Sequence, residues 1–185
     1  MSILELIHTR HSVSKVKPDP IPTAVIEKLL AAAVQAPNHH RVRPWRFVVL
    51  QGQAREGLGE VMAKALKDRK PETIDEVLEV ERHKPLRAPL LIAVGVDKPS
   101  EPKVLEIENV CAAAAACQNI LLAAHALGLG AKWRTGAPAS DPLVKAFLGF
   151  APDQHLIGFF YIGYPVGELS AQERPSYEDR TVWIG

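Results

Sequence analysis

The stretch VLEIENVCAAAAACQNILLAAHALG, residues 104–128, decides the fold class more than any other part of the sequence. Its alanines, flanked by leucines, predict a single helix of about 25 residues that ends at Gly128. The helix has little polar surface, so we expect it to be buried on several sides. Small residues in its middle would let another element approach closely, which fits either the spine of the core or an oligomer interface.

Strands are predicted on both sides of this helix. Residues 45–51 are rich in β-branched and aromatic types, whereas 88–96 and 155–165 are apolar runs of strand length. Residues 130–135 are predicted as a short strand or a turn. Helices alternate with these segments too irregularly for a doubly wound sheet. The order therefore favours an α+β fold with helices around a small sheet.

Several helix boundaries are predicted from capping residues and prolines. Residues 23–36 are predicted as a helix, with Thr23 as its N-cap and Pro37 just beyond its end. Ser140 is predicted to cap the helix that follows it. The charged segment 72–84 is interpreted as either another helix or a mobile lid.

The overall composition restricts the class of protein. With 185 residues and 47 % hydrophobic content, the chain is expected to fold as one domain, residues 1–185. A formal net charge of +1 argues against binding nucleic acid through its phosphates. No run approaches the roughly 18 apolar residues that span a bilayer, and the N-terminus lacks the features of a signal peptide. We therefore expect a cytoplasmic protein with neither nucleic acid nor membrane as partner.

The two cysteines, Cys111 and Cys117, both fall in the long predicted helix. Six residues of helix would separate their α-carbons by about 9 Å, beyond the ~7 Å that a disulfide tolerates. We interpret both as buried, small apolar side chains. No metal site is predicted from them.

A cationic stretch near the N-terminus is the first candidate site. The sequence HTRHSVSKVKPDPIP, residues 8–22, gathers Arg10, His11 and Ser12 just after a short apolar helix. Arginine offers a planar set of donors that suits phosphate oxygens, and serine adds a hydroxyl. A solvated surface loop is the alternative interpretation.

Two further loops carry polar groups beside strands. In QAPNHHRVRPWRF, residues 35–47, the adjacent His39 and His40 would point apart in an extended loop and have no carboxylate or cysteine close in sequence. A metal is therefore disfavoured, and either donors to a polar ligand or a plain exposed loop remain. In GLGAKWRTGAP, residues 128–138, Trp133 and Arg134 offer a flat apolar surface and a cation, or simply a core tryptophan beside a surface arginine.

The absence of familiar catalytic motifs is also informative. The chain has no nucleophile elbow, P-loop, HExxH or CxxC pattern, and GLG precedes a strand, the reverse of a dinucleotide fingerprint. If the protein is an enzyme, a bound organic cofactor is expected to carry the chemistry.

Taken together, the motifs resemble those of the nitroreductase family, flavin enzymes that bind FMN. The shared segments, in order, are RHS (10–12), APNHHRVRPW (36–45), GLGAKWRTG (128–136) and IGYP (162–165). The resemblance covers essentially the whole chain and is closest to the compact bacterial members. It implies a central, mostly antiparallel sheet flanked by helices in an intertwined homodimer. The tail, about 166–185, would pack on the partner subunit.

The same resemblance implies the cofactor-binding residues. Arg10, His11 and Ser12 would hold the FMN phosphate and ribityl chain, and Gln35 would also contact the flavin. Asn38 and His39 would reach the flavin of the other subunit. The remaining expected positions are Trp133, Arg134 and Thr135, beside the ring and phosphate, with Arg180 as an extra phosphate contact. No side chain is expected to be catalytic, because the chemistry takes place at N5 of FMN.

Two departures from the family pattern concern the charge on the reduced ring. Many members carry Lys or Arg two residues after the serine, near flavin N1 and O2, where this chain has Ser14 followed by Lys15. Arg43 and Lys132 are candidates for supplying that charge instead. Residues 68–87 are expected to shape the choice of substrate.

The activity implied by the resemblance is ping-pong hydride transfer. NADPH or NADH would reduce FMN and leave, and a nitroaromatic, quinone or related acceptor would then take two electrons at the same site. The alternatives are an FMN-binding carrier or sensor without reductase turnover, another reaction within the same fold such as dehydrogenation or reductive dehalogenation, and a flavin-free structural dimer.

Overall fold

The structure is a computed structural model of the 185-residue chain, and it describes residues 2–167 and 174–185. In these residues four antiparallel strands form one sheet in the order β1-β2-β4-β3. The strands are β1 (Trp45–Leu50), β2 (Leu90–Val96), β3 (Gly130–Arg134) and β4 (His155–Gly163). The α+β prediction with a mostly antiparallel sheet is therefore confirmed.

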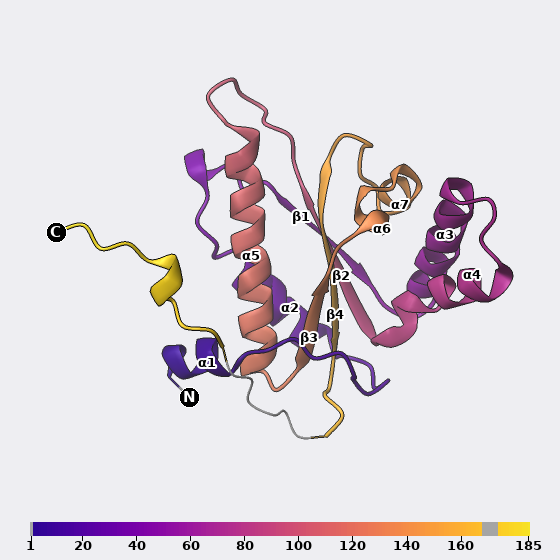
Figure 1. The fold of residues 1–185 in the computed structure, drawn as a ribbon, viewed down its shortest axis with the longest axis horizontal. Coiled ribbons are helices and arrows are strands. Elements are labelled where there is room, and N and C mark those ends of the chain that lie inside the picture. The colour runs from indigo at the N-terminus through magenta and orange to yellow at the C-terminus, as the bar shows by residue number, and fades with distance from the viewer. Residues whose placement is uncertain (1, 168–173) are drawn as a thin grey trace.

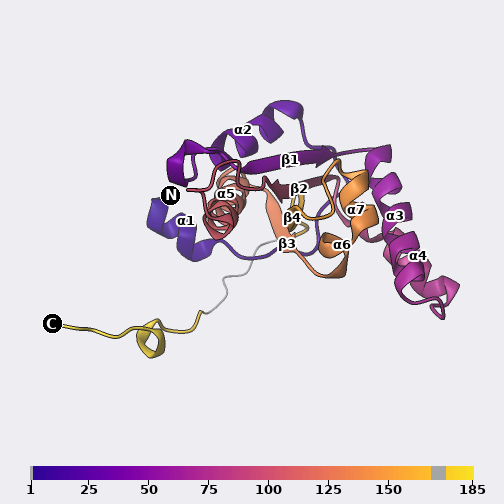
Figure 2. The same ribbon diagram turned by 90° about the horizontal axis from the view of Figure 1, so that it is seen from above.

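The central strands β2 and β4 divide the apolar core into two layers. Successive side chains of a strand point to opposite faces, so Leu90 and Ile92 join one core cluster while Leu91 and Ala93 join the other. The first face is covered by α2 (Thr23–Ala33) and α5 (Glu106–Ala126). The second is covered by α3 (Gln53–Arg69), α6 (Ala137–Ser140) and α7 (Pro142–Phe147). Figures 1 and 2 show the two layers on either side of the sheet.

Helix α5 corresponds to the long helix predicted from the sequence. It ends at Ala126, and Gly128 follows in the left-handed region with φ of 73°, as expected for a glycine that stops a helix. Ala113, Ala116 and Ile120 are fully buried against the sheet. By length and composition alone α5 is also apolar enough to cross a membrane, contrary to the expectation from the sequence, although a buried core helix passes the same test.

One face of α5 is not covered by its own chain. Ile107 is 62 % exposed, Cys111 is exposed, and Ala114 is partly exposed at the next positions of the same face. The expectation that both cysteines are buried is therefore wrong for Cys111. Cys117 is buried, and desolvation raises the pKa of its thiol to about 12.

The N-terminal segment crosses the edge of the sheet. A capping box between Ser2 and Glu5 starts α1 (Ile3–Thr9), which packs near the end of α5. The chain then runs beside β3 and the end of β4. The Val13 N–H donates to the Ala131 carbonyl at 3.0 Å, and the Lys17 N–H donates to the Tyr164 carbonyl at 2.7 Å.

Two predicted caps are wrong. Pro22 is the N-cap of α2, and Thr23 is its first helical residue, because Pro22 keeps an extended backbone with ψ of 143° while its carbonyl accepts the Ile26 N–H at 3.2 Å. Asp141 caps α7 by accepting the Leu143 N–H at 3.0 Å, whereas Ser140 ends α6. Both errors are shifts of one residue.

The segment interpreted as either a helix or a lid is helical. It forms α4 (Asp75–Arg82), followed by the short 3-10 turn η2 (Lys84–Arg87). Gly59 of α3 permits close packing, because a Cβ there would lie 2.0 Å from the Arg82 carbonyl oxygen. The described part of the tail extends away from the body, with Trp183 84 % exposed and Ile184 96 % exposed (Figure 1).

Candidate functional site

The loop after α1 places Arg10 beside a second guanidinium from the tail. Nη2 of Arg174 donates to the Arg10 carbonyl oxygen at 3.1 Å. Partial burial, and then the positive charge of Arg174, lower the pKa of Arg10. Two cations are thus held close together at this point.

Two histidines lie at the same loop. Nδ1 of His11 lies 3.1 Å from the Thr9 carbonyl oxygen, and Nε2 of His125, from α5, lies 2.9 Å from the Thr9 hydroxyl. Desolvation, followed by the charges of His11 and Arg10, lowers the pKa of His125. We call Arg10, His11, His125 and Arg174 the basic cluster.

The basic cluster has no carboxylate partner among the described residues. Every ion pair identified in residues 2–167 and 174–185 lies elsewhere. Positive charges that lower one another's pKa without a counter-charge are costly, and an anion bound there would relieve the repulsion. The donors, including the nearby Ser12 hydroxyl, are of the kind that binds phosphate oxygens.

Strand β3 adjoins this loop and presents different groups on its two faces. Nζ of Lys132 donates to the Ser14 hydroxyl at 2.8 Å, which connects the strand to the loop. The Arg134 guanidinium lies 5.3 Å from the centre of the Tyr161 ring, and its Nε is buried without a partner. Thr135 follows the strand and is exposed.

Trp133 lies on the opposite face of β3 in a fixed position. Its indole N–H donates to the Ile157 carbonyl at 3.1 Å, and its ring lies 5.2 Å from that of Phe160. Gly158 leaves the room, because a Cβ there would lie 2.6 Å from the indole nitrogen. The structure therefore brings Arg10–Ser12 to the start of the strand that carries Trp133 and Arg134.

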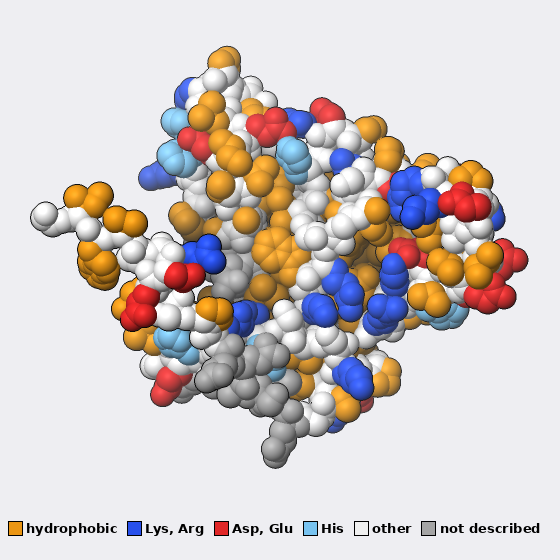
Figure 3. Space-filling view, viewed as in Figure 1, with side chains coloured by type: hydrophobic (Ala, Val, Ile, Leu, Met, Phe, Trp, Pro, Cys, Tyr) orange, Lys and Arg blue, Asp and Glu red, His pale blue; other side chains and the backbone are white. Residues whose placement is uncertain are grey.

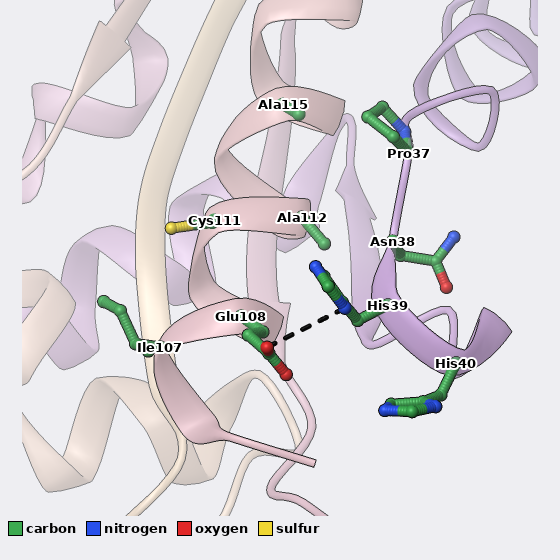
Figure 4. Close-up of a pocket in the computed structure, with 9 residues that line it drawn as sticks. All are labelled: Pro37, Asn38, His39, His40, Ile107, Glu108, Cys111, Ala112 and Ala115. Carbon is green, nitrogen blue, oxygen red and sulfur yellow. Dashed lines mark ion pairs between the residues drawn. The ribbon is translucent and has the colours of Figure 1, made fainter.

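The second predicted loop has an unusual backbone. His40, Arg41 and Arg43 all have φ near +50°, a region that costs a residue with a side chain about 1 kcal/mol or more. Oδ1 of Asn38 accepts the Arg43 N–H at 2.9 Å and holds the loop in this shape. Figure 4 shows the Asn38 side chain directed away from α5.

This loop and α5 border an open hollow of about 670 Å³. His39 points across it, with Nδ1 3.7 Å from Oε1 of Glu108 (Figure 4). Ile107, Cys111 and Ala115 supply apolar lining. Gln35 lies at the end of α2, where its amide donates to the Ala31 carbonyl at 3.3 Å.

The two groups of predicted residues lie at opposite ends of α5. His39 meets the helix at Glu108 and the basic cluster meets it at His125, a separation of about 25 Å along the helix at 1.5 Å per residue. Within one chain, Gln35, Asn38 and His39 are therefore not brought together with Arg10, Ser12 and β3. The expectation that this loop serves another subunit stays a prediction.

Sequence reasoning missed two members of the basic cluster. Arg174 reaches Arg10 from 164 positions along the chain, whereas Arg180, the tail residue that was predicted, pairs with its neighbour Asp179 at 3.0 Å. From the sequence, His125 is only one residue of the long predicted helix, and nothing marks it as a site residue. Neither residue lies in a motif, so only the fold could have identified them.

The fold and site define a class of α+β protein with a cluster of basic side chains at the edge of an antiparallel sheet. Comparison with known proteins gives its family: the Nitroreductase family model matches residues 7–164, and the chain belongs to that family. The protein named "Putative NAD(P)H nitroreductase YdjA" of Escherichia coli K12 is 31 % identical over 185 residues, covering 100 % of this chain and 98 % of that protein. A 5,6-dimethylbenzimidazole synthase of Rhodospirillum rubrum is 28 % identical, covering 95 % and 88 %.

Solved structures support the same fold. A nitroreductase-like family protein from Bacillus cereus superposes with a TM-score of 0.86 at 24 % identity, covering 100 % of this chain and 96 % of that one. A nitroreductase with bound FMN from Bacteroides fragilis has a TM-score of 0.76 at 26 % identity, with both chains fully covered. The family resemblance deduced from the motifs is confirmed.

Proposed function

We propose that this protein is an FMN-dependent NAD(P)H oxidoreductase that acts as a homodimer. The observation that carries the proposal is the basic cluster, which lacks a carboxylate among the described residues and adjoins β3 through Lys132 and Ser14. The family membership and the FMN bound to the Bacteroides fragilis nitroreductase support it.

The residues present fit FMN. Its phosphate is a dianion near neutral pH, and the Arg10 and Arg174 guanidiniums with the Ser12 hydroxyl supply charged and neutral donors for it. The buried, unpartnered Nε of Arg134 is a further donor on the adjoining strand. A buried donor without an acceptor costs about 1–3 kcal/mol, which a bound polar group would remove.

A second copy of the chain would complete the site. The hollow at one end of α5 offers apolar space, and the basic cluster at the other end offers charge. In a twofold dimer whose α5 helices pack antiparallel, the start of one helix lies beside the end of the other. The exposed face of α5 and the exposed tail supply apolar surface for such an interface.

Each residue then has a stated task. FMN would take a hydride from NAD(P)H and pass two electrons to an oxidised acceptor. Arg10, Ser12 and Arg174 would bind its phosphate, and the indole of Trp133, fixed by Ile157, would keep β3 in place beside it. Lys132 would place a positive charge near the ring, held there by Ser14, whereas Arg43 lies in the loop at the other end of α5.

The acceptor is proposed to be a nitroaromatic, a quinone or a related molecule. A planar, electron-poor acceptor would enter the same apolar space as the nicotinamide, which fits the ping-pong order. Residues 68–87, which include α4 and η2 and pack against α3, are proposed to influence this choice.

An absorption spectrum of the purified protein, followed by anaerobic NADPH and then an acceptor, tests the proposal. We expect a flavin spectrum that NADPH bleaches and that a quinone or nitroarene restores. A flavin spectrum that NADPH leaves unchanged would indicate a carrier or sensor. A colourless protein whose melting temperature does not respond to FMN would refute flavin binding.

A second candidate function comes from the relative named 5,6-dimethylbenzimidazole synthase, since it matches 95 % of this chain. A shared activity predicts that 5,6-dimethylbenzimidazole appears when the flavin-loaded protein is incubated with NADPH. Chromatography of that mixture separates the synthase from the reductase.

A further inference from the structure

A small hollow lies on the second face of the sheet, apart from the basic cluster. Its volume is about 280 Å³, and it lies between residues 16–18, the start of α3 and η2. Three cations line it, Lys17, Arg55 and Arg87, with Glu56 as the one carboxylate in its lining. The net charge of these four side chains is about +2 at neutral pH.

The three cations of this hollow have no ion-pair partner among the described residues, unlike two arginines around α3. Arg69 pairs with Asp141, and Arg82 pairs with Glu60 at 2.9 Å. Arg55, by contrast, donates through Nη1 to the Ala88 carbonyl at 2.7 Å, and its Nε is buried without a partner. Among the described residues, no ion pair involves Arg55, Arg87 or Lys17.

The backbone around these cations is held in place. The Lys17 N–H is bonded to Tyr164, and Val16 forms a bridge with Pro165 at the end of the sheet. Arg55 lies in the first turns of α3 and is braced by Ala88. The fold therefore fixes the backbone positions of Lys17 and Arg55.

Positive charge extends from this hollow towards β3. Burial raises the pKa of the Tyr161 hydroxyl to about 12, and the charges of Arg134 and Arg87 both oppose the rise. Arg87 thus acts on the same ring as Arg134, which lies over it. Figure 3 shows Lys and Arg side chains gathered in the middle of the face, over β3 and β4 and towards η2.

We propose that Lys17, Arg55 and Arg87 form a second anion site, which binds the phosphate group of a small molecule. A volume of 280 Å³ is at the lower limit for a whole ligand and suits one charged group. A net charge of about +2 matches a phosphate dianion, and the unpartnered Nε of Arg55 supplies a buried donor for one oxygen. The site does not depend on flavin binding.

The test is equilibrium dialysis of radiolabelled inorganic phosphate against FMN-saturated protein at constant ionic strength. We expect saturable binding of one phosphate per chain. Arg87→Gln and Lys17→Gln should each weaken it about tenfold or more, since each removes a charged hydrogen bond. Both side chains are exposed, and within residues 2–167 and 174–185 neither makes a side-chain hydrogen bond or an ion pair, so the variants should fold. The matched control is Lys28→Gln, an exposed cation on the other layer, which should leave binding unchanged.

Absence of saturable phosphate, or equal binding by wild type and Arg87→Gln, would overturn the proposal. Repeating the dialysis in an Arg10→Ala background separates the two sites. Phosphate that binds to the Arg10→Ala protein does not depend on the basic cluster. The presence or absence of this binding therefore tests the second site even if FMN binding fails.

Competition distinguishes two sources of the phosphate. If the site binds the 2′-phosphate of NADPH, we expect 2′,5′-ADP to displace the label from the wild-type protein and 5′-AMP not to displace it. Arg87→Gln should then also lose affinity for 2′,5′-ADP. If the site binds a free phosphate anion, we expect neither nucleotide to displace the label. Both results retain the site and assign its ligand.

Discussion

The two ends of α5 contrast in what they offer a ligand. At its start, a loop with three residues of positive φ and apolar side chains border an open hollow, where His39 faces Glu108. At its end, four basic groups gather around Thr9 and Arg10 without a carboxylate among the described residues. The apolar hollow and the basic cluster are thus about 25 Å apart in one chain. A cofactor that contacts both would need the hollow of one chain and the basic cluster of another.

The largest expected effect comes from placing a charge on the exposed face of α5. Cys111→Arg should dissociate the proposed dimer, because a guanidinium buried without a partner costs about 3–5 kcal/mol. Sedimentation equilibrium would measure the shift, with circular dichroism to show that the subunit still folds. Leu143→Arg, at a half-exposed position of α7, is the matched control and should stay dimeric. A Cys111→Arg dimer as tight as wild type would place the interface elsewhere.

The next largest effect compares the two ends directly. Arg10→Ala should weaken FMN binding by roughly 1.5–3 kcal/mol, the scale of a lost charged hydrogen bond, and His39→Ala by about 0.5–1.5 kcal/mol, the scale of a neutral one. Quenching of flavin fluorescence gives both affinities. Unchanged affinity in Arg10→Ala would remove that residue from the site.

Mixing the two variants tests whether one site draws on two chains. When Arg10→Ala and His39→Ala subunits are exchanged at random, about a quarter of all sites should receive an intact residue from each chain. That fraction should bind FMN with the wild-type affinity in a titration. A mixture that behaves as the sum of its parents would mean that each site is built within one chain.

A smaller effect concerns the charge beside β3. Lys132→Met should make the two-electron potential of bound FMN more negative by roughly 20 mV, the equivalent of about 1 kcal/mol, since the reduced ring loses a nearby cation. Ser14→Ala keeps the charge and should shift the potential less. Spectroelectrochemistry measures both. An equal potential in wild type and Lys132→Met would assign the stabilising charge to another residue.

The smallest effect is the pH dependence contributed by His125. Its pKa is lowered in the folded state, so the unfolded chain binds the proton first as the pH falls below about 6.5. Stability should therefore decrease between pH 7.5 and 5.5, less steeply in His125→Gln than in wild type. Melting curves across this range give the difference. Bound FMN should reduce the slope in wild type, because a phosphate near Arg10 and His11 favours the protonated imidazole.

Local sequence patterns predicted the elements of this fold well. The alanine-rich run of α5 and its stop at Gly128 depend on neighbouring residues alone, as do the apolar strands β2 and β4. The misplaced caps at Thr23 and Ser140 are one-residue errors between adjacent residues that can both begin a helix. Helices and strands of this kind can be predicted from residues that are close together in the sequence.

The sequence predicted the candidate site less completely, for a physical reason. The motifs predicted Arg10, Ser12 and Trp133 as site residues, but Arg174 meets Arg10 only through a contact between segments 164 positions apart. Exposure was misjudged at Cys111, because the same helical pattern fits a core helix and an interface helix. Contacts between distant segments are set by the packing of the whole chain.

The hydrogen bond from Arg174 to the Arg10 carbonyl has a consequence for loading and assembly. It joins the tail, expected to embrace the partner, to the loop expected to hold the phosphate. By reciprocity, flavin that orders this junction must tighten subunit association by the same factor by which association tightens flavin. Diluting the protein should therefore release the coenzyme. Saturating the protein with the coenzyme should keep the dimer from dissociating on dilution.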